Sequence, residues 1–132
     1  MTIQFGRIAM IAATLLVCVG SVHAAERKTF DAADFAAAQT KGDRILVDIS
    51  ATWCPTCKAQ KPTIESLAAA PENADLVIYD VDFDSMKDVV RGFGAQMQST
   101  LISYLGATET ARSVGDTDPT SIAALVASNR KP

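Results

Sequence analysis

Two cysteines lie three residues apart in the segment Trp53-Cys54-Pro55-Thr56-Cys57. Such a pair can form and open one disulfide, because a thiolate attacks a disulfide sulfur and a second thiol then releases the mixed disulfide. Proline after the first cysteine is typical of the first turn of a helix, and a helix N-terminus lowers the pKa of a thiol. We therefore expect Cys54 to be the exposed, attacking thiol and Cys57 the mostly covered, resolving thiol.

Two other interpretations of the cysteine pair differ in chemistry. A structural disulfide over so short a loop would constrain the unfolded chain little, which favours a redox pair. Zinc sites also use this spacing, but two sulfurs are half of a tetrahedral site. A metal would therefore need a second chain or an outside thiol.

Residues 1–24 have the pattern of a secretory signal. Arg7 precedes an apolar run of 15 residues, Ile8 to Val22, and the small-residue end Val22-His23-Ala24 follows. The run is shorter than the ~20 residues that span a bilayer. We expect cleavage before Ala25 and export to the periplasm, with an uncleaved membrane anchor as the alternative.

Cleavage after Ala24 would leave 132 − 24 = 108 residues, which suits one domain covering residues 25–132. It would remove Cys18 and the only histidine, His23, so that two cysteines and no histidine remain. This composition excludes Cys–His catalysis and a histidine-ligated metal within one chain. The remaining charge is 11 − 15 = −4 without a basic run, which argues against nucleic acid as a partner.

Hydrophobic periodicity and turn residues predict alternating strands and helices. Helices are expected over residues 29–39, 54–70 (kinked at Pro62), 85–93 and 118–128, and strands over 45–49, 76–81, 100–105 and 111–114. Strand, helix, strand implies a parallel pair, and the later hairpin adds antiparallel strands. The predicted fold class is α/β, a central mixed sheet of four to five strands flanked by helices on both faces.

Aspartates occupy two notable places in these strands. Asp48 interrupts the apolar run Ile45 to Ile49, either as a buried carboxyl that carries a proton for Cys57 or as a strand residue bonded to backbone. Asp80, Asp82 and Asp84 are spaced as in the start of a calcium loop. The glycine and the final glutamate of that loop are replaced by Ser85 and Arg91, so we interpret this segment as a strand end and a helix cap.

The chain resembles the thioredoxin superfamily in the strand that carries Asp48, in the Trp53-to-Cys57 turn, in Pro62 and in Val114-Gly115. The resemblance implies a thioredoxin-like fold and an exported thiol–disulfide oxidoreductase, which we expect to be a protein-disulfide reductase rather than an oxidase. It assigns proton transfer to Asp48 and implies a cysteine-containing protein substrate, an upstream thiol donor or acceptor, and no organic cofactor. The substrate-binding residues that it implies are Trp53, Pro55, Thr56, Gln98, Ser99 and Thr100. Alternatives are a metal- or iron–sulfur-binding module and a glutathione-using, glutaredoxin-like enzyme.

The sequence departs from the family pattern at three positions. Ser50 replaces a tryptophan, Asp80 replaces a lysine that often neighbours the buried aspartate, and Ser99 replaces a cis-proline that faces the cysteines. A cis bond before a non-proline residue costs ~2.5–4 kcal/mol, so we expect a trans peptide and a different loop path. The serine hydroxyl would then approach the sulfurs and the thiols would be uncovered. General disulfide-reductase activity would be weaker and the partner set narrower.

Overall fold

Strand β2 (Arg44–Ser50) forms the centre of the protein, and all of its residues except Ser50 are buried. The structure, a computed structural model, describes residues 23–132, so that almost all of the expected signal, residues 1–22, lies outside the described part. Within residues 23–132, no helix is long and apolar enough to cross a membrane. The other elements are β1 (Glu26–Thr29), α1 (Ala32–Lys41), α2 (Pro55–Ala69), a 3-10 helix η1 (Pro71–Asn73), β3 (Leu76–Asp82), α3 (Lys87–Gly92), β4 (Thr100–Leu105), β5 (Thr108–Val114) and α4 (Pro119–Ala127).

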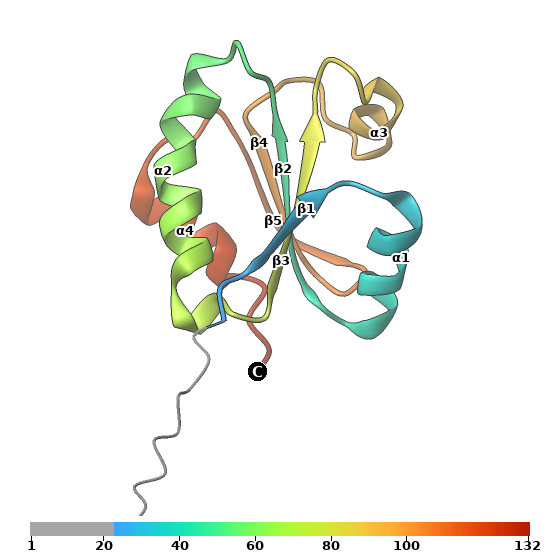
Figure 1. Cartoon of the computed structure of the whole chain (residues 1–132), viewed down its shortest axis with the longest axis vertical. Coiled ribbons are helices and arrows are strands. Elements are labelled where there is room, and N and C mark those ends of the chain that lie inside the picture. The colour runs from blue at the N-terminus through green and yellow to red at the C-terminus, as the bar shows by residue number, and fades with distance from the viewer. Residues whose placement is uncertain (1–22) are drawn as a thin grey trace, which may run out of the picture.

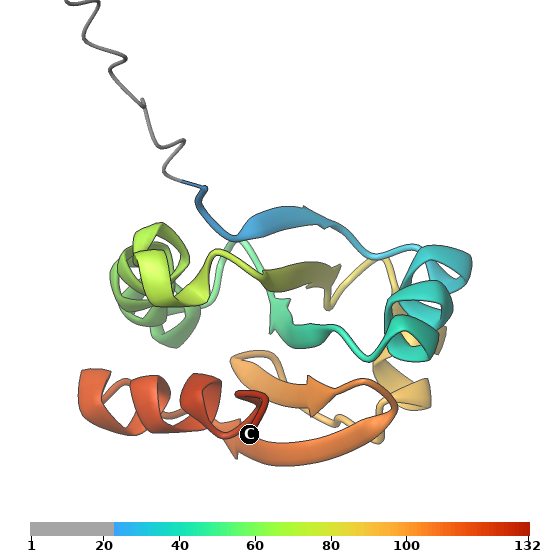
Figure 2. The same ribbon diagram turned by 90° about the horizontal axis from the view of Figure 1, so that it is seen from below.

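The five strands form one mixed sheet in the order β1-β3-β2-β4-β5 (Figure 1). Strands β1, β3 and β2 are parallel, β4 is antiparallel to β2, and β5 is antiparallel to β4. Helices α2 and α4 cover one face, and α1 and α3 cover the other, as the view from below shows (Figure 2). The predicted mixed sheet with helices on both faces is therefore confirmed.

Alternation along β2 divides the core into two layers. Leu46 faces α2 and α4 and belongs to a cluster with Ile64 and Ile122. Ile45, Val47 and Ile49 face the opposite side. There, Phe30 and Phe35 pack with further aromatic rings from β3, the C-cap of α3 and β4: Tyr79, Phe93 and Tyr104. A strand buried on both faces explains why this segment is a nearly continuous apolar run.

Strand β1 was not predicted from the sequence. A helix was expected over residues 29–39, whereas the chain first pairs with β3 and begins α1 at Ala32, where the Asp31 side chain accepts a hydrogen bond from the Asp34 N–H at 2.8 Å. The β1 sequence, Glu-Arg-Lys-Thr, contains no apolar residue and lies at the sheet edge. Its strand conformation therefore depends on hydrogen bonds to β3 rather than on its own hydrophobic pattern. Similarly, β5 begins at Thr108 instead of the expected 111.

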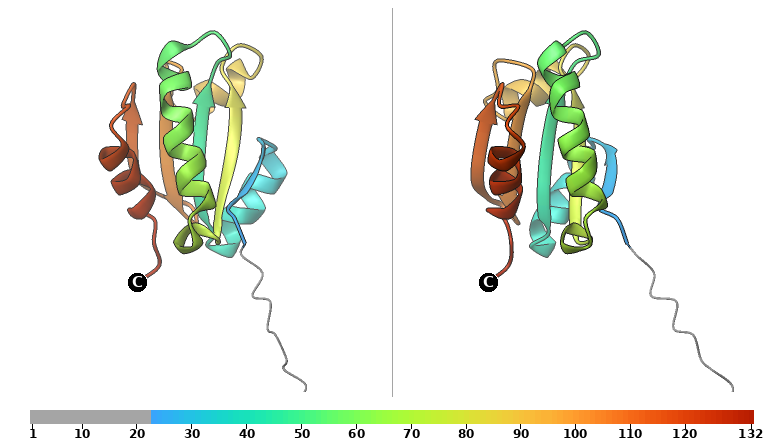
Figure 3. Two further views of the ribbon diagram at one scale, coloured as in Figure 1. Left: turned by 60° about the vertical axis from the view of Figure 1, so that its left-hand side comes forward. Right: turned by 90° about the vertical axis from the view of Figure 1, so that its left-hand side faces the viewer.

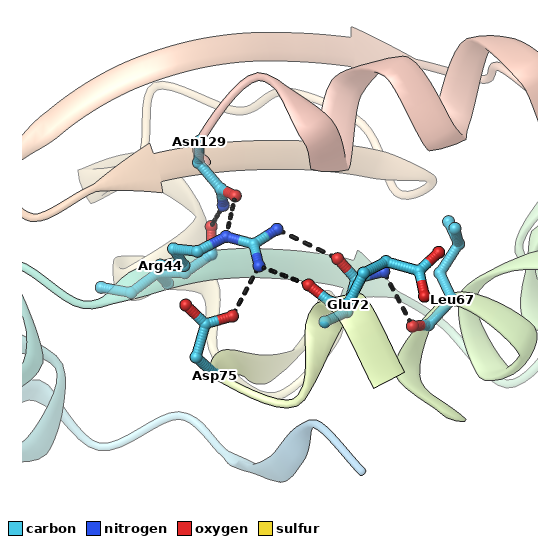
Figure 4. A network of polar contacts seen from close by, with 7 residues as sticks. Arg44, Leu67, Glu72, Asp75 and Asn129 are labelled. Atoms are coloured by element: carbon cyan, nitrogen blue, oxygen red, sulfur yellow. Dashed lines mark hydrogen bonds and ion pairs between the residues drawn. The ribbon is translucent and has the colours of Figure 1, made fainter. Parts of the chain in front are cut away.

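Arg44, at the start of β2, connects three segments that are distant in sequence (Figure 4). Its guanidinium donates hydrogen bonds to the side chains of Asn129 (2.9 Å), Asn73 (3.0 Å) and Asp75 (2.6 Å) and to the carbonyl of Glu72 (3.1 Å). The residue is buried, so these partners replace the water that the cation has lost. The network joins η1 and the segment after α4 to the end of the sheet at which β2 begins.

Candidate active site

Cys54 and Cys57 form a disulfide at the N-terminus of α2, which starts at the end of the sheet where β2 ends (Figure 3). Cys54 is the N-cap residue of this helix, and its Sγ accepts a hydrogen bond from the backbone N–H of Cys57 at 3.1 Å. Pro55 occupies the first helical turn, as predicted. The same N–H and the positive end of the helix dipole would stabilise a thiolate on Cys54 after reduction.

Both cysteines are buried in this disulfide form. Cys54 is 2% exposed and Cys57 is 9% exposed, with Ala51 and Phe83 packed against them. The expectation that Cys54 is exposed is therefore wrong for the oxidised state. The bond to Cys57 and the hydrogen bond from its N–H draw the Cys54 sulfur toward the helix and away from solvent.

Strand register determines which face of the sheet carries Asp48, a question that the sequence left open. Asp48 is two residues after Leu46 and shares its face, so it lies beneath α2, ~7 Å further toward the dithiol end of β2. On the same face of α2, Ile64 contacts this cluster and Cys57 lies two turns nearer the helix start. Asp48 is therefore buried on the side of the sheet that the resolving cysteine covers.

The environment of Asp48 contains one cation and one further carboxylate. An Arg27 Nη2 donates to Asp48 Oδ2 at 2.9 Å, and the same guanidinium binds Asp80 through two hydrogen bonds of 2.6 and 2.9 Å. Burial raises the pKa of Asp48, Arg27 lowers it in part, and the charge of Asp80 raises it further. The pKa of Asp48 therefore lies above the ordinary value for a carboxyl, with burial as the main cause.

Sequence reasoning missed Arg27. Asp80 stands at the position where a lysine was expected, directly opposite Asp48 in the register of β2 and β3. The structure supplies the cation from β1 instead, the strand that sequence periodicity did not predict. No signal in the sequence links Arg27 to Asp48, because only the pairing of β1 with β3 brings them together.

Ser99 adopts a left-handed conformation, with φ of 57°, and there is no cis peptide bond among residues 23–132. The expected trans bond is confirmed. The Ser99 hydroxyl donates to the carbonyl of Gln98, and the Thr100 hydroxyl donates to the carbonyl of Met97 at 2.7 Å. The Ser99 hydroxyl proton is therefore donated within its own loop. The predicted uncovering of the thiols is wrong for this state, since both cysteines are buried.

The Ser99 loop is fastened to the rest of the site through its carbonyl. The Ser99 carbonyl accepts hydrogen bonds from the backbone N–H of Gly115 (2.9 Å) and from the Gln60 side chain (3.3 Å). The buried Gln60 amide also donates to the carbonyl of Asp116 at 2.8 Å. Helix α2 thus holds both the loop before β4 and the turn after β5.

The predicted substrate-binding residues surround the same end of the sheet. Pro55 is exposed, while Thr56 and Gln98 are half-buried. The large exposed hydrophobic side chains of the described chain are Trp53, Met97 and Val114, which come from the segments before α2, before β4 and at the end of β5. Because β4 runs antiparallel to β2 and β5 runs antiparallel to β4, the start of β4 and the end of β5 lie at the end of the sheet where β2 ends. The three segments therefore meet at that end.

Neighbouring features extend this surface. The Trp53 indole N–H donates to Asp84 at 2.7 Å, which fixes the ring beside the dithiol. A shallow groove of about 330 Å³ lies next to the dithiol, because Phe83 packs against the cysteines and also lines the groove. The groove is lined by Phe83, Lys87, Val90, Arg91, Ala95 and Gln96. In residues 23–132, no group of three or more His, Cys, Asp or Glu side chains gathers as a metal site.

The protein has a mixed sheet, a disulfide at the start of helix α2 and a buried carboxyl on the face of the sheet that α2 covers. Together these features define a thioredoxin-like disulfide oxidoreductase. The chain belongs to the Thioredoxin family, whose sequence profile matches residues 23–128. It is 36% identical over 99 residues to Thioredoxin-2 of Saccharomyces cerevisiae, covering 74% of this chain and 92% of the yeast protein. Thioredoxin-1 of the same yeast is 34% identical over 102 residues, 77% of this chain and 94% of the relative.

Solved structures agree with this assignment. The crystal structure of Trxlp from Edwardsiella tarda has a TM-score of 0.74 and 37% sequence identity, covering 76% of this chain and 98% of that one. Thioredoxin from Malassezia sympodialis has a TM-score of 0.71 at 20% identity, with 81% and 92% covered, and shares the fold. The chain is therefore a thioredoxin-family disulfide oxidoreductase that acts through a cysteine pair.

Proposed function

We propose that this protein is an exported oxidoreductase that reduces disulfides in other proteins. The observation that carries the proposal is the Cys54–Cys57 disulfide at the N-terminus of α2, with Cys54 as the N-cap. An upstream thiol donor would reduce this disulfide, and a cysteine-containing protein would be the substrate.

Each half-reaction exchanges one sulfur–sulfur bond for another. The Cys54 thiolate attacks a substrate disulfide, forming a mixed disulfide and releasing one substrate thiolate, which takes a proton from solvent. Cys57 then loses its proton to the Asp48 carboxylate and attacks the Cys54 sulfur. The bond between Cys54 and the substrate breaks, and the second substrate sulfur leaves as a thiolate that takes up a proton from solvent. Asp48 releases its proton to return to the carboxylate, and the enzyme is left as the disulfide that the structure contains.

Asp48 suits the proton-transfer role because burial places its pKa above the ordinary range for a carboxyl. A raised pKa lies closer to neutral pH, and a group accepts and releases protons most effectively when its pKa is near the working pH. Asp48 also lies on the face of the sheet that is covered by α2, the helix that carries Cys57.

The proposed substrate surface consists of Trp53, Pro55, Thr56 and Gln98. Ser99 and Thr100, which were also expected to bind substrate, are buried, so their side chains would shape the loop beneath this surface. Exposed Trp53 and Met97 offer apolar contacts, and the loop before β4 offers backbone groups. The hydroxyls of Ser99 and Thr100 already bond the carbonyls of Gln98 and Met97. A substrate strand would have to share these acceptors, which favours a narrow set of partners.

The direction of electron flow is tested by the reduction potential of the Cys54–Cys57 couple in defined thiol buffers. A potential of about −270 mV supports a reductase, whereas one of about −120 mV would make the protein an oxidant. Insulin reduction, with Cys54→Ser as an inactive control, tests whether a protein disulfide is a substrate. No turnover of insulin or of any other protein disulfide would contradict the proposal.

Export rests on the signal pattern of residues 1–24. The expected result is a periplasmic protein that begins at Ala25 and is found in the soluble fraction. N-terminal sequencing of the exported fraction checks this. Intact Met1 in the membrane pellet would instead indicate an anchored protein.

A further inference from the structure

We propose that Arg27 is a positioning residue for the resolving step, which keeps the Asp48 carboxyl able to accept the proton of Cys57 and is itself held by Asp80. The proposal deepens the proposed function and rests on it. Its geometric basis is the three-residue cluster formed by side chains of β1, β2 and β3.

The three side chains lie on one face of the sheet. Asp48 and Asp80 are register partners on β2 and β3, and Arg27 pairs with Ile78 on β3, two residues before Asp80. Ile78 faces the α2 side, together with Leu46. Directly paired residues of neighbouring strands point to the same face, so Arg27 also points to the side that α2 covers.

Arg27 binds the two carboxylates in different ways. The Asp80 side chain, which is 37% exposed, accepts two hydrogen bonds from Nε and Nη2. The buried Asp48 side chain, 7% exposed, accepts one hydrogen bond from Nη2. The two-bond contact to Asp80 fixes the guanidinium plane, because paired hydrogen bonds define an orientation that a single one does not. Asp80 therefore holds the Arg27 guanidinium in place, and Asp48 is the carboxyl whose protonation Arg27 controls.

Without Arg27, two carboxylates on adjacent strands would face each other with no cation between them. Burial already disfavours the charged form of Asp48, and the uncompensated charge of Asp80 would disfavour it further. The fraction of Asp48 in the carboxylate form at a given pH would then be smaller, and fewer molecules could take the proton of Cys57. Arg27 thus sets the lowest pH at which the resolving step can proceed.

The remaining neighbours of Asp48 carry no competing charge. On β4 its register partner is Leu101, and on α2 the buried side chains are Cys57, the neutral Gln60 and Ile64. The charged residues of α2, Lys58, Lys61 and Glu65, are exposed. Helix α4 contains no ionisable side chain. Arg27 and Asp80 are therefore the charges that decide the protonation of Asp48.

The first test is a direct titration of the Asp48 carboxyl carbon by NMR in the full oxidised protein, with Asp48→Asn used to assign the signal. Arg27→Met should raise the pKa of Asp48 by about 1 to 3 pH units, the range over which a neighbouring arginine shifts a carboxyl. Arg27→Gln provides the same loss of charge if the methionine variant does not fold. An Asp48 titration that is unchanged in the variant would overturn the proposal.

Two further variants separate charge from structure. Lys28→Met removes one positive charge from the same strand, but Lys28 binds Asp34 and contacts the Tyr79 ring on the opposite face. It should leave the titration of Asp48 as in the wild type. The double variant Arg27→Met/Asp80→Lys returns a cation to the register partner of Asp48 and removes the carboxylate that raises the pKa of Asp48, so this pKa should fall to its wild-type value or below it. A shift that persists in the double variant would show a structural role for Arg27 and contradict the proposal.

The second test is the pH dependence of the resolving step, measured by stopped flow as decay of the mixed disulfide. The acid limb in Arg27→Met should move to higher pH with the Asp48 titration. At pH values below both pKa values, the step should be about tenfold slower for each pH unit by which the pKa of Asp48 rises. An acid limb that does not move while the pKa does would overturn the link to catalysis. If the wild type resolves no mixed disulfide at all, the proposed function fails, and the NMR titration still tests the control of Asp48 by Arg27.

Discussion

The backbone N–H of Cys57 donates a hydrogen bond to the sulfur of Cys54 at 3.1 Å, which makes the two cysteines of this site unequal. Cys54 caps α2 with its sulfur at the positive end of the helix, whereas Cys57 belongs to the first helical turn. The unpaired N–H groups of a helix start stabilise negative charge. Reduction should therefore place the thiolate on Cys54.

Cys57→Ser is expected to accumulate mixed disulfides between Cys54 and substrate proteins, because the resolving thiol is absent. Cys54→Ser, the matched control, should trap few or none, since Cys57 lacks the capping position. Capture from an extract of exported proteins, followed by non-reducing gels, checks this. Equal trapping by both variants would contradict the assignment of Cys54 as the attacking thiol.

Asp48→Asn is expected to slow the resolving step more than the initial attack on the substrate. Asparagine has nearly the same shape but accepts no proton at neutral pH, so only the step in which Cys57 is deprotonated should suffer. Stopped-flow kinetics of the two steps separate these contributions. If both rates equal those of the wild type, Asp48 has only a structural role.

The pH dependence of stability provides an independent measure of the Asp48 environment. The folded-state pKa of Asp48 is raised above its unfolded value, so the folded protein binds more protons than the unfolded chain between the two values. Stability should therefore decrease as pH rises through this window and remain reduced at neutral pH. Asp48→Asn should remove that decrease and be more stable than the wild type at pH 7, as measured by urea unfolding. A variant with the wild-type pH profile would contradict the raised pKa.

Ser99→Pro is expected to destabilise the protein by more than about 1 kcal/mol, because proline requires φ near −65° and Ser99 has φ of 57°. Ser99→Gly should change the free energy of unfolding by less than about 1 kcal/mol, since glycine adopts positive φ readily. Urea unfolding of both variants, with insulin reduction and metal content measured beside it, provides the comparison. A proline variant as stable as the wild type would mean that the loop rearranges without cost.

Arg44→Met is expected to lower the free energy of unfolding by about 3–5 kcal/mol, because it leaves buried partners of the network without their donor. Asp75→Asn is the matched control. The Asp75 side chain is 56% exposed, so the loss of its ion pair with Arg44 should lower the free energy of unfolding by less than about 1 kcal/mol. Insulin reduction per folded molecule should stay unchanged in both variants, since Arg44 lies at the opposite end of β2 from the dithiol. An equal, small loss of stability in the two variants would contradict the central role of Arg44.

Much of the site could be predicted from the sequence because its signals are local. Cysteine spacing and Pro55 define the start of α2 through the geometry of one helical turn. The apolar run before it predicts a strand buried on both faces, and Asp48 within that run predicts a buried carboxyl with a raised pKa. These features depend on residues that are close together in the chain.

The tertiary structure alone decided the features that depend on distant segments. The polar sequence of β1 has no strand pattern, so its position at the sheet edge, and with it the contact of Arg27 with Asp48 and Asp80, follows from pairing with β3. The left-handed Ser99 is held through its carbonyl by Gly115 and Gln60, which the sequence places far away. Strand pairing and burial depend on contacts between distant segments of the chain. Side-chain periodicity, in contrast, depends only on the residues of a single helix or strand. The sequence itself determined where the dithiol stands on its helix, and the assembled sheet decided which charges surround the carboxyl beneath it.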